Sequence, residues 1–297
     1  MNKSVAILTL LIISALWGAQ YPVIKYLVQS GLSPSEITFY RIIIGFLALA
    51  LYMLWKKEKF PTTLKFWVLS ASLGLCGDFF AQYLIALGQQ TITAGFSSIL
   101  IATSPFFTFL IPYFIPGQHL KKPHTTQLIS LFFGLIGIVL LSYKQLQMST
   151  HIFAIACLVG ASLMFAIVNI IAEYARDYSG LSMSTASVFI MSMTLLPMNY
   201  HNLFSFDTIS IPAISGILFL AIFCTAISFI LMLFLAQGTN AVYLSYSNFL
   251  VPVFGVLFAV LLIHETIQPE MIISILFIFL GIVLLNFKKS RNKQIYD

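Results

Sequence analysis

Ten apolar segments, each long enough to cross a lipid bilayer, follow one another along this chain of 297 residues. A helix needs about 17–25 residues to span a hydrocarbon core of roughly 30 Å. The predicted spans are residues 5–28, 35–55, 66–87, 94–115, 126–143, 152–175, 182–198, 212–236, 242–262 and 270–287. The connections are short, so none of them can hold a separate folded domain. The pattern predicts an all-α polytopic membrane protein.

The composition excludes a soluble globular fold. Hydrophobic residues make up 60% of the chain and charged residues only 8%, against about 25% charged in a typical globular domain. A soluble domain of this length needs a polar surface that these residues cannot supply, so lipid must surround the protein. The three cysteines lie inside apolar runs without ligand spacing, and we expect no metal, cofactor or disulfide.

The positions of lysine and arginine predict the orientation in the membrane. With the N-terminus in the cytoplasm, the outer loops carry only Lys144. The cytoplasmic segments carry Lys3, Lys56, Lys57, Lys59, Lys65, Lys121, Lys122, Arg176, Lys288, Lys289, Arg291 and Lys293. We therefore expect both termini in the cytoplasm of a plasma membrane, as in a bacterial inner membrane. The net charge of +6 is then explained by loops, and no nucleic-acid partner is expected.

The second half of the chain repeats the first. Four residues recur 147 positions later: Ala94, Ser98, Pro105 and Phe107 correspond to Ala241, Ser245, Pro252 and Phe254. The sequence of residues 137–141 returns at 281–285. The predicted repeats are residues 1–147 and 148–297, which form one membrane domain. Each holds five spans, an odd number, so the second repeat enters the membrane upside down. Inverted repeats are typical of secondary transporters, with the substrate site near the midplane.

Several short motifs resemble the EamA branch of the drug/metabolite transporter superfamily. They are Trp17-Gly18 with Pro22 and Lys25, Phe39-Tyr40-Arg41, the proline-containing spans at Pro105 and Pro252, and His264-Glu265. The resemblance covers nearly the whole chain and implies ten spans in two inverted halves. The chain departs from the family at Gly117-Gln118, where an acidic residue is expected, and in the sixth span, which lacks the Trp-Gly pair. Asp78 is not part of the family pattern.

Three ionisable residues lie inside predicted spans: Lys25, Arg41 and Asp78. Such groups cost about 2.5–3.5 kcal/mol to insert on translocon scales and are functional candidates. Arg41 and Asp78 lie at similar depth on consecutive spans and could form a structural ion pair, or they could face a cavity and bind a charged or zwitterionic solute. Asp78 could also carry a proton, but pairing with Arg41 would oppose that role. Lys25 lies nearer the outer end, where it could extend toward the interface.

Other candidates share helix faces with these residues. Trp17, Tyr21 and Lys25 are spaced four apart, as are Asp78 and Gln82, so each set lies on one face. Polar residues in the sixth and ninth spans complete the predicted substrate-binding set, which is Trp17, Tyr21, Lys25, Arg41, Asp78, Gln82, Asn169, Tyr246 and Asn248. Pro105 and Pro252 each remove a helix hydrogen bond and are predicted hinges. Packing kinks and lipid-interface anchors are the structural alternatives.

The leading functional hypothesis is a secondary transporter that moves a small organic metabolite, such as an amino acid or related zwitterion, by alternating access. No GxxxxGK[ST] motif for nucleotide binding is present in the sequence, so a gradient must drive transport. Expected partners are the solute, membrane lipid and a coupling ion such as a proton, while the oligomeric state is open. The alternative is a lipid-modifying or lipid-handling membrane protein, but the five histidines do not converge on Asp78 in the predicted topology.

Overall fold

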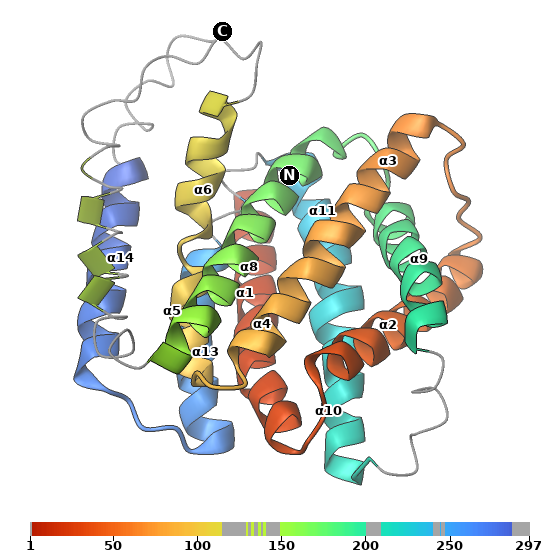
Figure 1. Ribbon diagram of the computed structural model, residues 1–297. Helices are drawn as coiled ribbons and strands as arrows, with labels where there is room; N and C mark the ends of the chain where they lie inside the picture. Colours follow the sequence, from red (N-terminus) through yellow and green to blue (C-terminus); the bar gives the residue numbers. More distant parts are fainter. Residues whose placement is uncertain are drawn as a thin grey trace, which may run out of the picture.

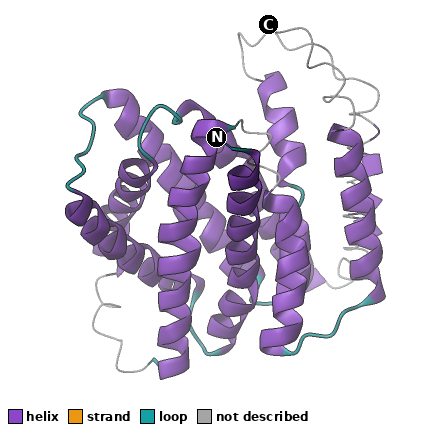
Figure 2. Cartoon of the chain, turned by 180° about the vertical axis from the view of Figure 1, so that it is seen from behind, coloured by secondary structure: helices purple, strands orange, loops and turns teal. Residues whose placement is uncertain are grey.

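The computed structural model describes the backbone of residues 2–114, 149–199, 209–239, 244 and 247–286, and of seven isolated positions between 129 and 140. Every regular element in these residues is helical (Figure 2). Seven helices in this part of the chain are long and apolar enough to cross a membrane. Their ranges are Ser4–Gln29, Pro34–Lys56, Leu64–Gly88, Ala94–Phe114, His151–Tyr174, Gly180–Pro197 and Ile211–Gly238. The prediction of an all-helical, multi-pass membrane protein is confirmed.

These seven helices coincide with predicted spans one to four and six to eight. Two further apolar helices, α13 (Ser247–Ile263) and α14 (Pro269–Asn286), occupy the positions of predicted spans nine and ten. The predicted fifth span, residues 126–143, lies largely outside the described residues. The first helix, α1, extends over Lys3–Gln29 and contains Pro22.

Local capping explains where several helices begin. Helix α2 (Pro34–Lys56) starts with a capping box between Ser33 and Glu36, and Pro34 occupies its first turn. There the Ser33 side chain accepts from the backbone of Glu36, and the Glu36 carboxylate accepts from the backbone of Ser33. These bonds satisfy amide groups that the helix leaves unpaired. The side chains of Thr63, Thr93 and Ser210 each accept from a backbone amide in the first turn of the helix that follows, without the reciprocal bond of a capping box.

Two of the spans contain a π-helical turn. The third span consists of α3 (Leu64–Leu73), the π-helical segment η1 (Gly74–Ala81) and α4 (Gln82–Gly88). The eighth consists of α10 (Ile211–Ala221), the π-helical segment η5 (Ile222–Ile227) and α11 (Ser228–Gly238). Such turns are rare and are frequent at functional sites. They occupy corresponding positions, since the two segments begin 148 residues apart.

The two repeat-related prolines have different effects on the backbone. The fourth span is broken into α5 (Ala94–Ile101), α6 (Ser104–Leu110), which has Pro105 in its first turn, and the short η2 (Ile111–Phe114). The carbonyl of Ile101, which Pro105 cannot bond, accepts instead from the Ser162 hydroxyl at 3.5 Å. Pro252, by contrast, lies within the continuous helix α13. The predicted helix break therefore occurs at Pro105, where a side chain from the other half of the sequence satisfies the freed carbonyl.

Helices from the two halves of the chain pack against each other (Figure 1). Helix α1 contacts α13, and α5 contacts both α13 and α8 (Ser149–Tyr174). Helices α2 and α3 contact α9 (Gly180–Asn199), while α2 also contacts α10 and α4 contacts α8. At the crossing of α1 and α13, a Cβ on Gly18 would overlap Phe254. The two halves thus interleave in one bundle.

Candidate functional site

Arg41 on α2 is the largest fully buried side chain of the described protein and is only 2% exposed. Its Nη1 donates to Oε1 of Gln82 at 2.7 Å and to Oε1 of Gln20 at 3.0 Å. Its Nη2 donates to the carbonyl of Cys224 at 3.0 Å, and its Nε donates to the Thr225 hydroxyl. Four of the five guanidinium N–H groups therefore have partners, and all of these partners are neutral. The guanidinium is a buried charge without a contacting counter-ion among the described residues.

Asp78 on η1 does not form the ion pair with Arg41 that the sequence allowed. The two groups, both in the described part of the chain, interact electrostatically without contacting each other. Asp78 is 2% exposed, and its Oδ2 accepts a hydrogen bond from the Ser187 hydroxyl at 3.0 Å. The interpretation of Arg41 and Asp78 as a structural ion pair is wrong, because the guanidinium bonds to amides, a hydroxyl and a carbonyl instead.

Arg41 and Asp78 each join the two halves of the chain. Arg41 on α2 bonds to Thr225 on η5, and Ser187 on α9 bonds to Asp78 on η1. Residue numbers 41 and 187 differ by 146, and 78 and 225 differ by 147. Both differences are close to the offset of 147 residues between the two copies of the sequence repeat. In both contacts, a side chain on one long helix bonds to the π-helical segment from the other half. The two hydrogen bonds thus lie at corresponding positions of the sequence repeat.

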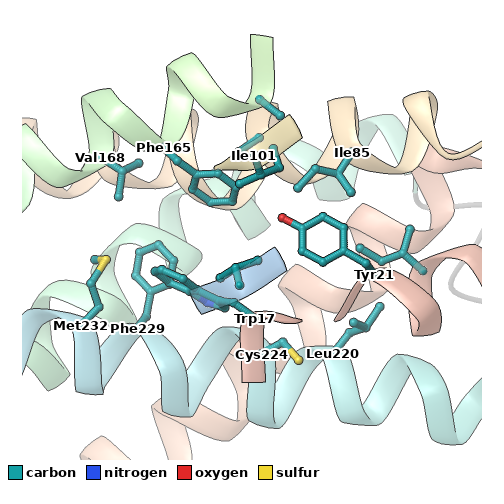
Figure 3. Close-up of a cluster of buried hydrophobic side chains, with 14 of the residues drawn as sticks. Trp17, Tyr21, Ile85, Ile101, Phe165, Val168, Leu220, Cys224, Phe229 and Met232 are labelled. Carbon is teal, nitrogen blue, oxygen red and sulfur yellow. The ribbon is translucent and has the colours of Figure 1, made fainter. Parts of the chain in front are cut away.

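An aromatic cluster lies beside Arg41. The Trp17 and Phe165 rings stack with their centroids 6.0 Å apart. Figure 3 shows Tyr21 beside them, with its hydroxyl directed toward the side of the cluster that holds Phe165 and Ile101. Tyr21 interacts electrostatically with Arg41, and Cys224, in the same cluster, supplies the carbonyl that binds the guanidinium. The buried cation and the aromatic cluster therefore adjoin.

Some buried polar atoms of this region make no hydrogen bond of good geometry among the described residues. They include the Tyr21 hydroxyl and Nδ2 of Asn169. Tyr21 is 0% exposed and Asn169 is 2% exposed. Asn169 lies four residues after Phe165, on the same face of α8. A buried polar group left unbonded costs about 1–3 kcal/mol, and such groups in a native protein require an explanation. A bound solute that accepts from these donors would supply one.

Lys25, a member of the predicted substrate-binding set, places its ammonium group at the C-terminal end of another helix, α4. Its ammonium donates to the carbonyls of Gln89 and Ile92 at 2.7 and 2.9 Å, where α4 ends. At the other end of the connection from α4 to α5, the backbone amides of Ala94 and Gly95 donate to the Glu265 carboxylate at 2.7 and 2.9 Å. Helix α5 begins at these amides, and Glu265 lies after α13. Each charge suits the helix end that it meets. These two side chains hold the connection from α4 to α5 in place.

The remaining predicted residues divide into two groups. Gln82 lies in the Arg41 network, while Tyr246 and the side chain of Asn248 lie outside the described residues. Sequence reasoning missed Gln20, Phe165, Ser187 and Thr225. A signal existed for Thr225, because it lies one repeat length, 147 residues, after Asp78. No cluster of three metal-ligating His, Cys, Asp or Glu side chains occurs among the residues that the structure describes.

Comparison with known proteins gives a consistent result. The sequence profile of the EamA-like transporter family matches the chain twice, over residues 4–143 and 152–287. The uncharacterized transporter YoaV of Bacillus subtilis (strain 168) is 24% identical over 294 residues, or 95% of this chain and 96% of that protein. The WAT1-related protein At3g02690, chloroplastic, of Arabidopsis thaliana is 21% identical over 93% of this chain and 68% of its own length. A crystal structure of a protein with 16% identity covers 96% of this chain and 98% of its own, with a TM-score of 0.66, and supports the fold.

Proposed function

Because the chain belongs to the EamA-like transporter family, we propose that it is a secondary transporter that carries a small organic carboxylate, such as an amino acid or related zwitterion, by alternating access. The proposed binding site comprises Arg41, Gln82, Trp17, Tyr21 and Asn169. The observation that carries the proposal is the Arg41 guanidinium, which is buried inside the bundle and whose hydrogen-bond partners in the described part of the chain are all neutral.

The proposed solute neutralises this charge. An unpaired cation inside a bilayer is expensive, and such residues mark substrate or ion pathways. Arg41 keeps one Nη2 N–H outside the four bonds described above. The nearby Tyr21 hydroxyl interacts with Gln20 but makes no hydrogen bond of good geometry among the described residues. A carboxylate accepts from both kinds of donor, and a guanidinium binds it with charge-assisted hydrogen bonds. The rings of Trp17 and Phe165 offer an apolar surface for the rest of the solute.

Alternating access requires two halves that can exchange conformations. The double match to the family profile and the corresponding π-helical segments support two structural repeats. The helix contacts also correspond in pairs: α1 with α13 matches α8 with α5, and α3 with α9 matches α10 with α2. We propose that the repeats, residues 1–147 and 148–297, are inverted with five spans each, and that Pro105 and Pro252 act as hinges. Both termini are then cytoplasmic, in a plasma membrane.

A binding experiment tests the site. We expect carboxylates from a panel of amino acids, hydroxy acids, amines and sugar phosphates to raise the melting temperature of the purified protein by mass action. Tyr21→Phe removes a hydroxyl that interacts with the Gln20 side chain but makes no hydrogen bond of good geometry among the described residues, so it should fold and bind the same solute roughly tenfold more weakly.

Tyr178→Phe is the matched control. It removes the hydroxyl that lies 3.2 Å from the Thr63 hydroxyl, in a contact away from Arg41, and should leave affinity unchanged. If no member of the panel stabilises the wild type, or if Tyr21→Phe binds as tightly as the wild type, this site does not bind the solute.

A further inference from the structure

Asp78 is a buried carboxylate at a contact between the two halves of the chain. It lies on η1, and its Oδ2 accepts from the Ser187 hydroxyl of α9 at 3.0 Å. This hydroxyl has a single proton and also lies 2.9 Å from the Ser184 carbonyl, the alternative acceptor within α9. Backbones also meet here, because a Cβ on Gly74 would lie 2.6 Å from the carbonyl oxygen of Ser187. The Asp78–Ser187 hydrogen bond therefore joins two closely packed helices, one from each half.

No cation contacts this carboxylate among the described residues. Helices α2, α3, α4, α8 and α9 pack against η1. The charged group that faces Asp78 from α2 is Arg41, which acts on it electrostatically but directs its hydrogen bonds elsewhere. The described residues of α3, α4, α8 and α9 supply no charged group that interacts with Asp78, and α9 supplies only the neutral Ser187 hydroxyl. An ionised carboxylate held by one hydroxyl in a buried position is costly, and a proton removes that cost.

We propose that Asp78 binds the proton whose gradient drives transport, an inference that rests on the proposed function and names its coupling ion. This assigns Asp78 a role other than the solute binding predicted from sequence. A proton from water on one side of the membrane binds to the carboxylate and forms a carboxylic acid. After the halves rearrange, the proton returns to water on the other side. The cycle requires no other reactant.

The geometry links the proton to the rearrangement. A hydrogen bond to an ionised carboxylate is roughly twice as strong as one between neutral groups. Protonation therefore weakens the bond from Ser187 and loosens the contact between η1 and α9. The corresponding contact in the repeat, between Arg41 and Thr225, has a permanent cation and does not respond to a proton in this way. Protonation thus changes one of two corresponding contacts and favours one arrangement of the halves.

Infrared difference spectroscopy between acidic and alkaline buffers tests protonation without any solute. The chain has only nine Asp and Glu residues, so the carboxyl bands are few. We expect the wild type in lipid to show the C=O stretch of a protonated carboxylic acid that disappears in Asp78→Asn and persists in Glu36→Gln, the control. Ser187→Ala should shift this band to higher frequency, because the hydrogen bond to the carboxyl group is lost. A wild-type difference spectrum that Asp78→Asn leaves unchanged would overturn the proposal.

Transport by reconstituted protein separates coupling from binding. The probe is the panel carboxylate that stabilises the wild type most. We expect Asp78→Asn to keep exchange of this solute across the membrane but to lose all accumulation driven by a pH gradient. Retained accumulation, or loss of both activities in a folded protein, contradicts the proton role. If Asp78→Asn does not fold, Asp78→Glu keeps the proton site and should give the same infrared titration at a shifted frequency. If the infrared band depends on Asp78 but no solute exchanges in the wild type, only the proposed function fails.

Discussion

At the scale of single residues, Arg41 combines two features that are rarely found together. It is almost completely buried, and its hydrogen bonds reach Gln20, Gln82, Thr225 and the Cys224 carbonyl, none of which is charged. A buried ion pair loses about 3–5 kcal/mol when one partner is removed, because the other charge is left uncompensated. Arg41 has no contacting ionic partner among the described residues. Replacing Arg41 by a neutral side chain should therefore not cost the 3–5 kcal/mol that breaking a buried ion pair costs.

Arg41→Gln should therefore separate binding from stability. The glutamine amide has two N–H donors for the four oxygens that Arg41 bonds, and the lost cost of burying a charge offsets the bonds that are no longer made. We expect the free energy of unfolding to stay within about 1 kcal/mol of the wild type, while stabilisation by carboxylates is lost. Reversible unfolding in mixed micelles, with and without the solute, measures both quantities.

Lys25→Gln is the matched control for this prediction. It removes a charge that bonds to the carbonyls of Gln89 and Ile92 at a helix end, so stability should fall while the solute still binds. A loss of about 3–5 kcal/mol in Arg41→Gln, with solute binding intact, would identify Arg41 as a structural residue.

The sequence identified the charged members of the site and missed most of their partners. Arg41 and Asp78 are conspicuous because ionisable residues are rare inside apolar spans. Gln20 and Ser187 are ordinary side chains whose importance depends on which helices pack together. The ion-pair alternative is wrong for the same reason, since similar depth on consecutive spans does not fix the direction of either side chain.

At the scale of helices, a narrow seam of small residues holds α1, α5 and α13 together. A Cβ on Gly18 of α1 would overlap Phe254 of α13, and a Cβ on Gly255 would overlap the Ser98 side chain of α5. Small residues allow such close approach between membrane helices, where van der Waals packing contributes much of the attraction. The seam joins helices of both halves next to the site.

Gly255→Ala should destabilise the protein by about 1–3 kcal/mol, the typical cost of overpacking. Ser98→Gly removes the side chain that the new methyl group would meet, so the double variant should recover part of this loss. Unfolding free energies of the two single variants and the double variant give the coupling directly. Strictly additive effects would show that the two positions do not contact each other.

Helix positions were predictable from apolar run length, because a bilayer leaves few alternatives to helices for an apolar chain. The interruptions within spans were less predictable. Pro105 breaks its span and Pro252 does not, although the repeat places them in equivalent positions. The local sequence did not predict the π-helical segments η1 and η5, which depend on how neighbouring helices pack.

At the scale of the whole molecule, the proposed site lies where helices from the two halves of the chain pack against each other. The Trp17–Phe165 stack, the Arg41–Thr225 bond and the Asp78–Ser187 bond all join residues before position 148 to residues after it. A rearrangement of one half against the other would therefore alter the proposed solute and proton sites together. This is the arrangement that alternating access requires.

Solute counterflow in proteoliposomes shows directly whether the protein is a secondary transporter. Vesicles loaded with the unlabelled panel carboxylate that stabilises the protein most are diluted into a trace of the labelled form, without ATP or an ion gradient. A secondary transporter exchanges the two, so we expect a transient accumulation of label that protein-free vesicles do not show. Equal label in both preparations, with folded protein that binds the solute, would contradict this expectation.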